Sequence, residues 1–210
     1  MKIALHGLIG SGKSTIAKCL RDEHGFQIVT LAQPIYIATN LSREFICGTH
    51  VFPVDLQNYI ADLTDADGET IYAEWMGLMR KYCNLLMEDG KPRAFLQDWG
   101  TMMKSFDENV FIRHALDRAE KDNCVCDDLR MADEACAFRA DGWALVEVVL
   151  PESIRMERVN SLYPEQVPLL NHHTETELSG WDDWDGYICT GGLVDDLPGK
   201  VEALLGELQL

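Results

Sequence analysis

The sequence predicts an α/β fold with three layers, in which helices cover both faces of a mostly parallel, five-stranded sheet. Short apolar runs alternate with segments of helical periodicity along the chain, as in strands joined by crossover helices. The run 144–150 is apolar nearly throughout, which is typical of a strand covered on both faces. The 210 residues, 47% of them hydrophobic, support one substantial core, so we expect a single domain over residues 1–210.

The first element is a strand that leads into a glycine-rich loop and a helix. Ile3–Leu5 is apolar, and Gly7–Ser14 then matches the pattern G-x-x-x-x-G-K-[ST]. Glycines let the backbone curl tightly, so that several N–H groups point at a polyphosphate, and the helix N-terminus adds positive partial charge. We therefore expect a phosphate-binding loop and a helix that ends near Gly25. The residues expected to bind the nucleotide are Gly10, Ser11, Gly12, Lys13, Ser14 and Thr15.

The remaining strands are predicted from short apolar runs at 26–31, 124–126, 144–150 and 187–189. Helical patterns follow Pro34 and Pro151, cover 72–87, 93–104 and 110–121, and close the chain up to Leu208. No strand pattern occurs between Thr49 and Phe106, so we interpret 49–106 as a helical insertion. The polar segment 159–184 is predicted to be a mobile lid.

Composition limits the partners and the compartment. A formal charge of −17 would repel a nucleic-acid backbone, so we expect no nucleic-acid polymer as partner and expect the few cations to gather where phosphates bind. Seven cysteines form no C-x-x-C pair, which favours reduced, buried thiols and a cytoplasmic location. No apolar run has membrane-spanning length and no cleavable signal precedes the loop, so no membrane partner is expected.

Candidate metal ligands come from the loop and from the end of a strand. Lys13 is expected to reach the β- and γ-phosphates, and Ser14 to place its hydroxyl on a Mg²⁺ ion. Asp127 and Asp128 follow the apolar run 124–126, where a carboxylate can meet that ion directly or through water, and we favour Asp128. The alternative is that both aspartates cap the helix that follows.

Three arginines are candidates for the phosphates. Arg130 could fork onto a phosphate of donor or acceptor, or form a surface ion pair with Asp133 or Glu134. Arg155 and Arg158 lie one helical turn apart just before the polar segment, so a closing lid could bring both onto a migrating phosphoryl group. Their alternative is an intrahelical pair with Glu152. For His172 and His173 we expect a role in lid folding, because a His-His pair alone makes a poor zinc site.

The combined pattern resembles the phage-type deoxynucleoside monophosphate kinases, which are P-loop enzymes, over nearly the whole chain. The resemblance lies in the glycine-rich loop, in Leu31–Ile35, Arg93–Thr101, Asp128–Arg130 with Glu134, His172–Leu178 and Asp185–Gly191. It implies a P-loop kinase fold that moves the γ-phosphoryl group of ATP to a deoxynucleoside monophosphate (dNMP), giving ADP and dNDP, with Mg²⁺ as cofactor.

The resemblance also implies roles for residues of the insertion, which would bind the acceptor. Arg93 would contact the monophosphate, Gln97 would lie near the base or sugar, and Trp99 would stack on the base or pack internally. Arg130, Arg155 and Arg158 would hold phosphates, and Glu175 would help to order the lid. The chain departs from the family pattern at Met102–Lys104, where the family has an Arg, and at Thr190, where it has an Asn. These departures bear on the identity of the acceptor base.

Two other functions stay open. A different small-molecule kinase, such as one resembling dephospho-coenzyme A kinase, would share the loop and the lid arginines. A nucleotide-dependent switch or ATPase would need no acceptor site, although the chain has no N-K-x-D guanine-reading motif. The accepted bases, the oligomeric state (a homodimer is one option), the extent of lid closure and the aspartate nearer the metal are undecided by the sequence.

Overall fold

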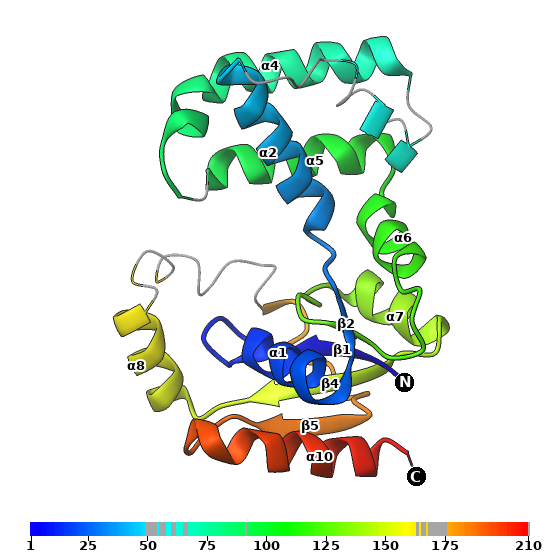
Figure 1. The fold of residues 1–210 in the computed structure, drawn as a ribbon, viewed down its shortest axis with the longest axis vertical. Helices are drawn as coiled ribbons and strands as arrows, with labels where there is room; N and C mark the ends of the chain where they lie inside the picture. The colour runs from blue at the N-terminus through cyan, green and yellow to red at the C-terminus, as the bar shows by residue number, and fades with distance from the viewer. Residues whose placement is uncertain are drawn as a thin grey trace. The chain divides into compact units, whose positions relative to one another are not determined.

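The computed structural model describes residues 1–48, 54, 58–59, 62–64, 67–90, 92–162, 164, 167 and 176–209. These residues form two compact units, which Figure 1 shows with their helices and strands labelled. The first unit contains Met1–Leu31 and Ala115–Leu210, and the second contains Ala32–His114. The chain therefore leaves the first unit after Leu31 and returns to it after His114. The insertion at 49–106 and the lid at 159–184 stay predictions.

The first unit is built on a five-stranded sheet with the order β2-β3-β1-β4-β5. Its strands are β1 (Lys2–His6), β2 (Gln27–Val29), β3 (Cys124–Cys126), β4 (Ala144–Val149) and β5 (Gly186–Cys189). All four strand pairings are parallel, so the sheet predicted to be mostly parallel is entirely so. The α/β class and all five strands are confirmed. Because every strand runs the same way, their carboxyl ends meet at one edge.

Helices pack on both faces of this sheet. On one face, α1 (Lys13–His24) and α10 (Leu197–Glu207) cover a core that comprises Ile3, Leu5, Val125, Val146 and Val148 from the strands and Ile16, Leu20, Val201 and Leu204 from the helices. Strand side chains alternate between faces, so Ala4, Cys126 and Leu145 point to the opposite side. There α7 (Ala132–Ala140) packs against β4, and Figure 1 shows α7 and α10 on different sides of the sheet. The three predicted layers are present.

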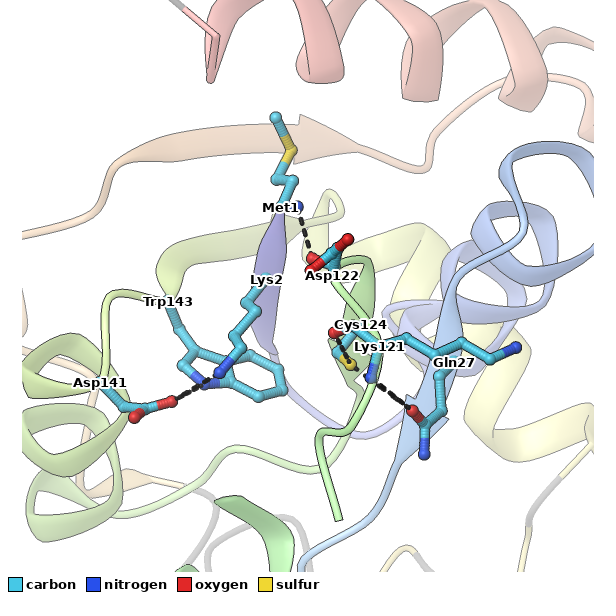
Figure 2. Close-up of polar contacts among 8 residues, drawn as sticks. All are labelled: Met1, Lys2, Gln27, Lys121, Asp122, Cys124, Asp141 and Trp143. Atoms are coloured by element: carbon cyan, nitrogen blue, oxygen red, sulfur yellow. Dashed lines mark hydrogen bonds and ion pairs between the residues drawn. The ribbon is translucent and has the colours of Figure 1, made fainter. Parts of the chain in front are cut away.

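Polar contacts hold the amino-terminal end of the sheet, as Figure 2 shows. The Lys2 ammonium donates to Asp141 Oδ2 at 2.9 Å and lies 5.7 Å from the centre of the Trp143 ring. The Met1 amino group donates to the carbonyl oxygen of Asp122 at 2.6 Å, and Gln27 Oε1 accepts from the Lys121 amide. The first two residues thus tie β1 to the segments that precede β4 and β3, and Gln27 ties β2 to the segment that precedes β3. They lie at the opposite end of the strands from the glycine-rich loop.

The second unit is helical among its described residues. It contains α2 (Gln33–Ile46), α4 (Gly68–Met87), α5 (Arg93–Phe106) and the start of α6 (Val110–Asp117). Pro34 lies in the first turn of α2, as predicted, and Asp67 caps α4 by accepting from the amides of Glu69 and Thr70. The predicted helix 110–121 ends at Asp117, four residues early. The other predicted helices of this unit are confirmed.

Two polar side chains of α2, Arg43 and Ser42, form hydrogen bonds with α4 and the residues that follow it. Arg43 donates to the carbonyl oxygens of Leu86 at 3.0 Å, Glu88 at 3.2 Å and Gly90 at 2.6 Å, which satisfies acceptors where α4 ends. The buried Trp75 Nε1 donates to Ser42 Oγ at 3.0 Å. Side chains of α2 therefore satisfy backbone carbonyl groups at the end of α4 and the buried indole N–H of Trp75.

The state of the cysteines and the lengths of the helices can be compared with the expectations of buried thiols and of no membrane-spanning segment. All seven cysteines are free thiols, but only Cys124 and Cys126 are buried, and Cys47, Cys83, Cys136 and Cys189 are exposed. The expectation of buried thiols was therefore wrong for most of them, because exposed helix faces and the outer edge of β5 carry them. None of the helices that the structure describes combines the length and apolarity that crossing a membrane requires.

Candidate active site

The loop between β1 and α1 adopts the backbone that its glycines predict. Gly10 and Gly12 have φ angles of +83° and +94°, in the left-handed region that other residues adopt at a cost. The Ser11 amide donates to the Leu8 carbonyl at 3.0 Å, which closes a tight turn. A Cβ atom on Gly10 would lie 2.7 Å from Val159 Cγ2, so the loop approaches its neighbour too closely for a side chain there. A Cβ atom on Gly7 would lie 2.7 Å from the backbone oxygen of Val148, so geometry requires glycine at all three positions of the loop.

Residues from α8 (Glu152–Leu162) and from the end of β5 hold this loop. Arg155, only 8% exposed, donates from Nη1 to the Ile9 carbonyl at 3.3 Å. Thr190 Oγ1 donates to the Ser11 carbonyl at 2.5 Å, and Arg158 Nη2 donates to the Thr190 carbonyl at 3.0 Å. Both arginines predicted to serve the lid therefore lie beside the loop. The pair of Arg155 with Glu152, weighed as the alternative, also forms at 3.8 Å, and the two contacts coexist.

Lys13 is the cation at the centre of the loop. Its Nζ donates to the backbone carbonyl of Gly7. Burial, together with the positive charge of Arg130, lowers the pKa of Lys13 to about 8, whereas Asp127 and Asp128 act in the opposite direction. The amine is still mainly protonated at pH 7. Arg130, Asp127 and Asp128 are thus near enough to Lys13 for their charges to act on it.

His6 is a site residue that the sequence analysis missed. It is 4% exposed at the end of β1, and its Nδ1 donates to the Leu129 carbonyl at 3.2 Å. Its ring stacks on Trp184, with centroids 5.2 Å apart and an interplanar angle of 10°. Burial lowers its pKa to about 4, with smaller contributions from Lys13 and Arg130, so the imidazole is neutral at pH 7. The available signal was a polar residue that ends an apolar strand one position before Gly7.

The two aspartates after β3 have different surroundings. Asp128 Oδ1 accepts from the Leu31 amide at 2.9 Å and from the Cys126 thiol, whose sulfur lies 3.2 Å away. Asp127 makes no hydrogen bond or ion pair with the residues that the structure describes. Neither caps α7, since Met131 is the N-cap residue of that helix. The helix-capping alternative that the sequence left open was therefore wrong.

Glutamates perform the capping that the aspartates do not. Glu134 Oε2 accepts from the amides of Arg130 at 2.9 Å and Met131 at 3.0 Å. Burial raises the pKa of Glu134 to about 7, although these two bonds oppose the rise. Glu177, which lies in the carboxyl-terminal part of the predicted lid, accepts from the Ala132 amide at 3.1 Å. Two carboxylates thus fix the backbone on which Arg130 is carried.

A pocket of about 260 Å³ opens beside the loop at the carboxyl end of β4. Among its lining residues are His6, Gly7, Ser11, Glu147, Arg155 and Ser179. Ser11 Oγ is buried and lacks a hydrogen-bond partner within the described part of the chain, and burial raises the pKa of Glu147. The pocket therefore offers the side chain of Arg155 to a small polar group, whereas the Ser11 hydroxyl is covered.

The possible metal ligands near the loop suit Mg²⁺ bound together with a substrate better than a metal ion bound by protein side chains alone. The described residues contain no group of three or more His, Cys, Asp or Glu that could hold a metal ion. The available oxygens are the exposed Ser14 hydroxyl and the carboxylates of Asp127 and Asp128. Hard oxygen donors in small number are what Mg²⁺ uses when substrate phosphates and water complete its shell. The residues present thus fit Mg²⁺ bound together with a nucleotide.

The residues predicted to bind the acceptor lie on α5, in the second unit. Arg93 is the first residue of α5 and half-buried, and Gln97 is exposed one turn later, on the same side of the helix. Trp99 is fully buried, and its indole nitrogen has no partner among the described residues. Its burial with Phe95, Met102 and Met103 supports the packing alternative. The spacing i, i+4, i+7 and i+8 of these four residues was the signal for that role.

Some predicted lid residues fall outside the description. His172, His173 and Glu175 lie outside the described residues. At the carboxyl-terminal end of this segment, Arg139 Nη2 donates to the carbonyl oxygen of Asp183. The next residues are held as well, because Asp185 accepts from Arg139 at 3.3 Å and from the Leu145 amide at 2.7 Å. Residues 176–185 thus attach to α7 and β4 at the carboxyl-terminal end of the segment.

Comparisons with known proteins show the fold and no family. No family model matches the chain, and no curated protein matches it. Among solved structures, the chain is similar to TT1252 from Thermus thermophilus, with 19% identity, coverage of 99% of this chain and 97% of that one, and a TM-score of 0.53. An unliganded sugar kinase from Janibacter sp. HTCC2649 aligns at 14% identity over 98% of this chain and 94% of that one, with a TM-score of 0.45. The likeness to TT1252 shows a shared fold.

Proposed function

We propose that this protein is an ATP-dependent kinase that transfers the γ-phosphoryl group of ATP to a deoxynucleoside monophosphate, giving ADP and a dNDP. The observation that carries the proposal is the loop after β1. It combines left-handed glycines, a half-buried lysine and an α-helix whose N-cap, Gly12, provides no capping side chain. Backbone N–H groups at such a helix start favour a phosphate. On this basis we assign the Gly7–Ser14 segment as a P-loop.

The surrounding charges fit phosphoryl transfer. An acceptor phosphate oxygen attacks the γ-phosphorus while the bond to the β–γ bridging oxygen breaks and ADP leaves, so the protein needs to align the groups and stabilise their charge. Lys13, Arg130, Arg155 and Arg158 would supply that positive charge, in a chain whose formal charge is −17. Ser14 and a carboxylate of the Asp127–Asp128 pair would hold Mg²⁺, which neutralises phosphate charge when bound.

The proposed acceptor site is assigned residue by residue on α5. We assign Arg93 to the acceptor phosphate and Gln97 to its base or sugar, because a cation and an exposed amide lie one turn apart at the start of α5. We propose the segment 159–184 as the lid that closes over the phosphates. The free thiols suit a reducing compartment, which favours the cytoplasm.

The deciding experiment measures ADP release by the purified protein with ATP and Mg²⁺. The acceptors are dAMP, dGMP, dCMP and dTMP in separate reactions, beside dephospho-coenzyme A and a reaction without acceptor. Release that depends on one or more dNMPs supports the proposal and names the base. A response only to dephospho-coenzyme A would move the function to another small-molecule kinase, and release that ignores every acceptor would indicate an ATPase or switch.

Two pairs of variants locate the sites in that assay. Lys13→Ala should lower kcat by roughly a hundredfold or more, because it removes charge stabilisation of the transferring group, whereas Lys18→Ala, exposed on α1, serves as the matched control. Arg93→Ala should mainly raise the acceptor KM, with the exposed Arg80→Ala on α4 as its control. Near-normal turnover of Lys13→Ala would contradict the P-loop assignment, and an unchanged acceptor KM in Arg93→Ala would contradict the acceptor assignment.

A further inference from the structure

Asp128 joins the carboxyl ends of two neighbouring strands through its side chain. The backbone pairing of β2 with β3 ends at Val29 and Cys126. Two residues further along both strands, the Leu31 amide donates to Asp128 Oδ1 at 2.9 Å. The Cys126 thiol, which is fully buried, donates to the same oxygen across 3.2 Å. The carboxylate thus continues the pairing of β2 and β3 beyond the point where the backbone bonds stop.

The bond to Leu31 lies where the chain leaves the first unit. Leu31 is the last residue of that unit before the second begins at Ala32, and it is 4% exposed. Ala32 is the N-cap residue of α2 and provides no side-chain cap. The return crossing after His114 lies inside α6, whose helical hydrogen bonds run through it. The outward crossing has no helix at Leu31, where the backbone amide donates to Asp128.

Asp127 differs from Asp128 in its contacts. It makes no hydrogen bond or ion pair with the part of the chain that the structure describes, whereas Asp128 Oδ1 accepts from both the Leu31 amide and the Cys126 thiol. Neighbouring residues at the end of a strand point in different directions, so one carboxylate can bond to Leu31 while the other stays available to a ligand. The two side chains are therefore suited to different tasks.

We propose that Asp128 is a positioning residue that fastens the outward crossing at Leu31 to the end of β3, and that Asp127 is the carboxylate that faces the bound cation. The fastening stands on the geometry of this chain alone. The assignment of Asp127 rests on the proposed function, because it presumes that Mg²⁺ and ATP bind at the P-loop.

Hydrogen exchange at the Leu31 amide tests the fastening without any substrate. Asp128→Ala removes the acceptor and should speed exchange at Leu31 by roughly tenfold or more, since a bond to a charged group is lost. Asp128→Asn keeps an acceptor oxygen and should stay within about threefold of the unmodified protein, as should Asp127→Asn. The β1 amides should be unchanged in all three and report that the sheet is intact.

Two results would overturn the fastening. One is an unchanged exchange rate at Leu31 in Asp128→Ala, and the other is equally fast exchange in Asp128→Asn. Should the alanine variant fail to fold, Asp128→Glu gives the same comparison, because it keeps the charge but displaces the oxygen by one methylene. Fast exchange at Leu31 in that variant supports the fastening, and unchanged exchange contradicts it.

The second half is tested by calorimetric titration of ATP at a series of Mg²⁺ concentrations. Asp127→Asn should raise the Mg²⁺ concentration that gives half-maximal ATP affinity by roughly tenfold, as loss of a ligand or its partner does at other metal sites. Asp128→Asn should raise it less. A larger effect of Asp128→Asn would reverse the assignment. If the unmodified protein bound no ATP, the proposed function and the assignment of Asp127 would fail together, while exchange at Leu31 would still decide the fastening.

Discussion

Replacing Gly10 with alanine tests the close packing between the loop and α8. The backbone of Gly10 has φ +83°, and a Cβ atom would lie 2.7 Å from Val159 Cγ2, where real Cβ contacts essentially never occur. Val159 is fully buried, so its methyl groups have no solvent-filled space into which to move. Gly10→Ala therefore carries two separable costs, one from the backbone and one from the contact.

The structure gives the size of each cost. A left-handed backbone costs an L-residue about 1–2 kcal/mol, and overpacking a buried site costs about 1–3 kcal/mol, so Gly10→Ala should lower the free energy of unfolding by about 2–5 kcal/mol. Val159→Ala alone should cost about 2 kcal/mol for the buried groups it removes. In the double variant the contact cost disappears but the backbone cost remains. The double variant should then be about 1–3 kcal/mol more stable than the sum of the single effects predicts.

Urea titration of the four proteins of this cycle measures the coupling. Unfolding of the first unit is followed by hydrogen exchange in peptides from β1 and α1, so that the second unit does not contribute to the signal. Single effects that add within about 0.5 kcal/mol would refute the proposed contact between residues 10 and 159. A cost of Gly10→Ala below about 1 kcal/mol would refute the left-handed backbone as well.

Two further predictions concern buried polar groups. Ser42→Ala should lower the free energy of unfolding of the second unit by about 1–3 kcal/mol, because the buried Trp75 Nε1 loses its acceptor. Ser105→Ala, which removes another hydroxyl of the second unit, is the control. Equal thermal midpoints for the two variants would contradict the prediction. For His6, the pKa of about 4 lies below its ordinary value of 6.5, so the unfolded chain binds the proton first and stability falls as the pH drops from 6.5 toward 4. The loss from this group should be about 3 kcal/mol. Glu134 has a pKa raised to about 7, so its protonation makes the folded protein more stable over much of the same pH range. The effect of His6 is therefore measured as a difference between the unmodified protein and His6→Asn, by urea titration at pH 7 and at pH 4.5. Parallel pH profiles of the two proteins would contradict the buried neutral imidazole.

Local patterns were enough to predict the sheet, its helices and the loop. All of β3 and the residues Leu145, Val146 and Val148 of β4 are buried, and Gly25 ends α1 with the left-handed cap typical of glycine. Such features depend on residues a few positions apart. The sequence therefore contains most of the information about which segments become strands and which become helices.

Contacts between distant residues were beyond that reasoning. The bond between Leu31 and Asp128 joins residues 97 positions apart, and that between His6 and Leu129 joins residues 123 apart. No periodicity predicts that Asp128 bonds to a backbone amide of another strand or that Trp184 stacks on His6. Different roles could be assigned to Asp127 and Asp128 only once the order of the strands was known. Trp99 is different, because its helical spacing with other buried residues was visible in the sequence.

The strand order has a consequence for how this chain folds. β2 and β3 are neighbours in the sheet, yet the whole of residues 32–114 lies between them in the sequence. Closing a flexible loop costs entropy that grows with its length, by about 0.6 kcal/mol for each doubling. If the second unit folds first, its helices replace much of that flexible chain with a rigid spacer of fixed end separation. The order of synthesis also favours this sequence of events, because residues 32–114 leave the ribosome before β3, β4 and β5 do.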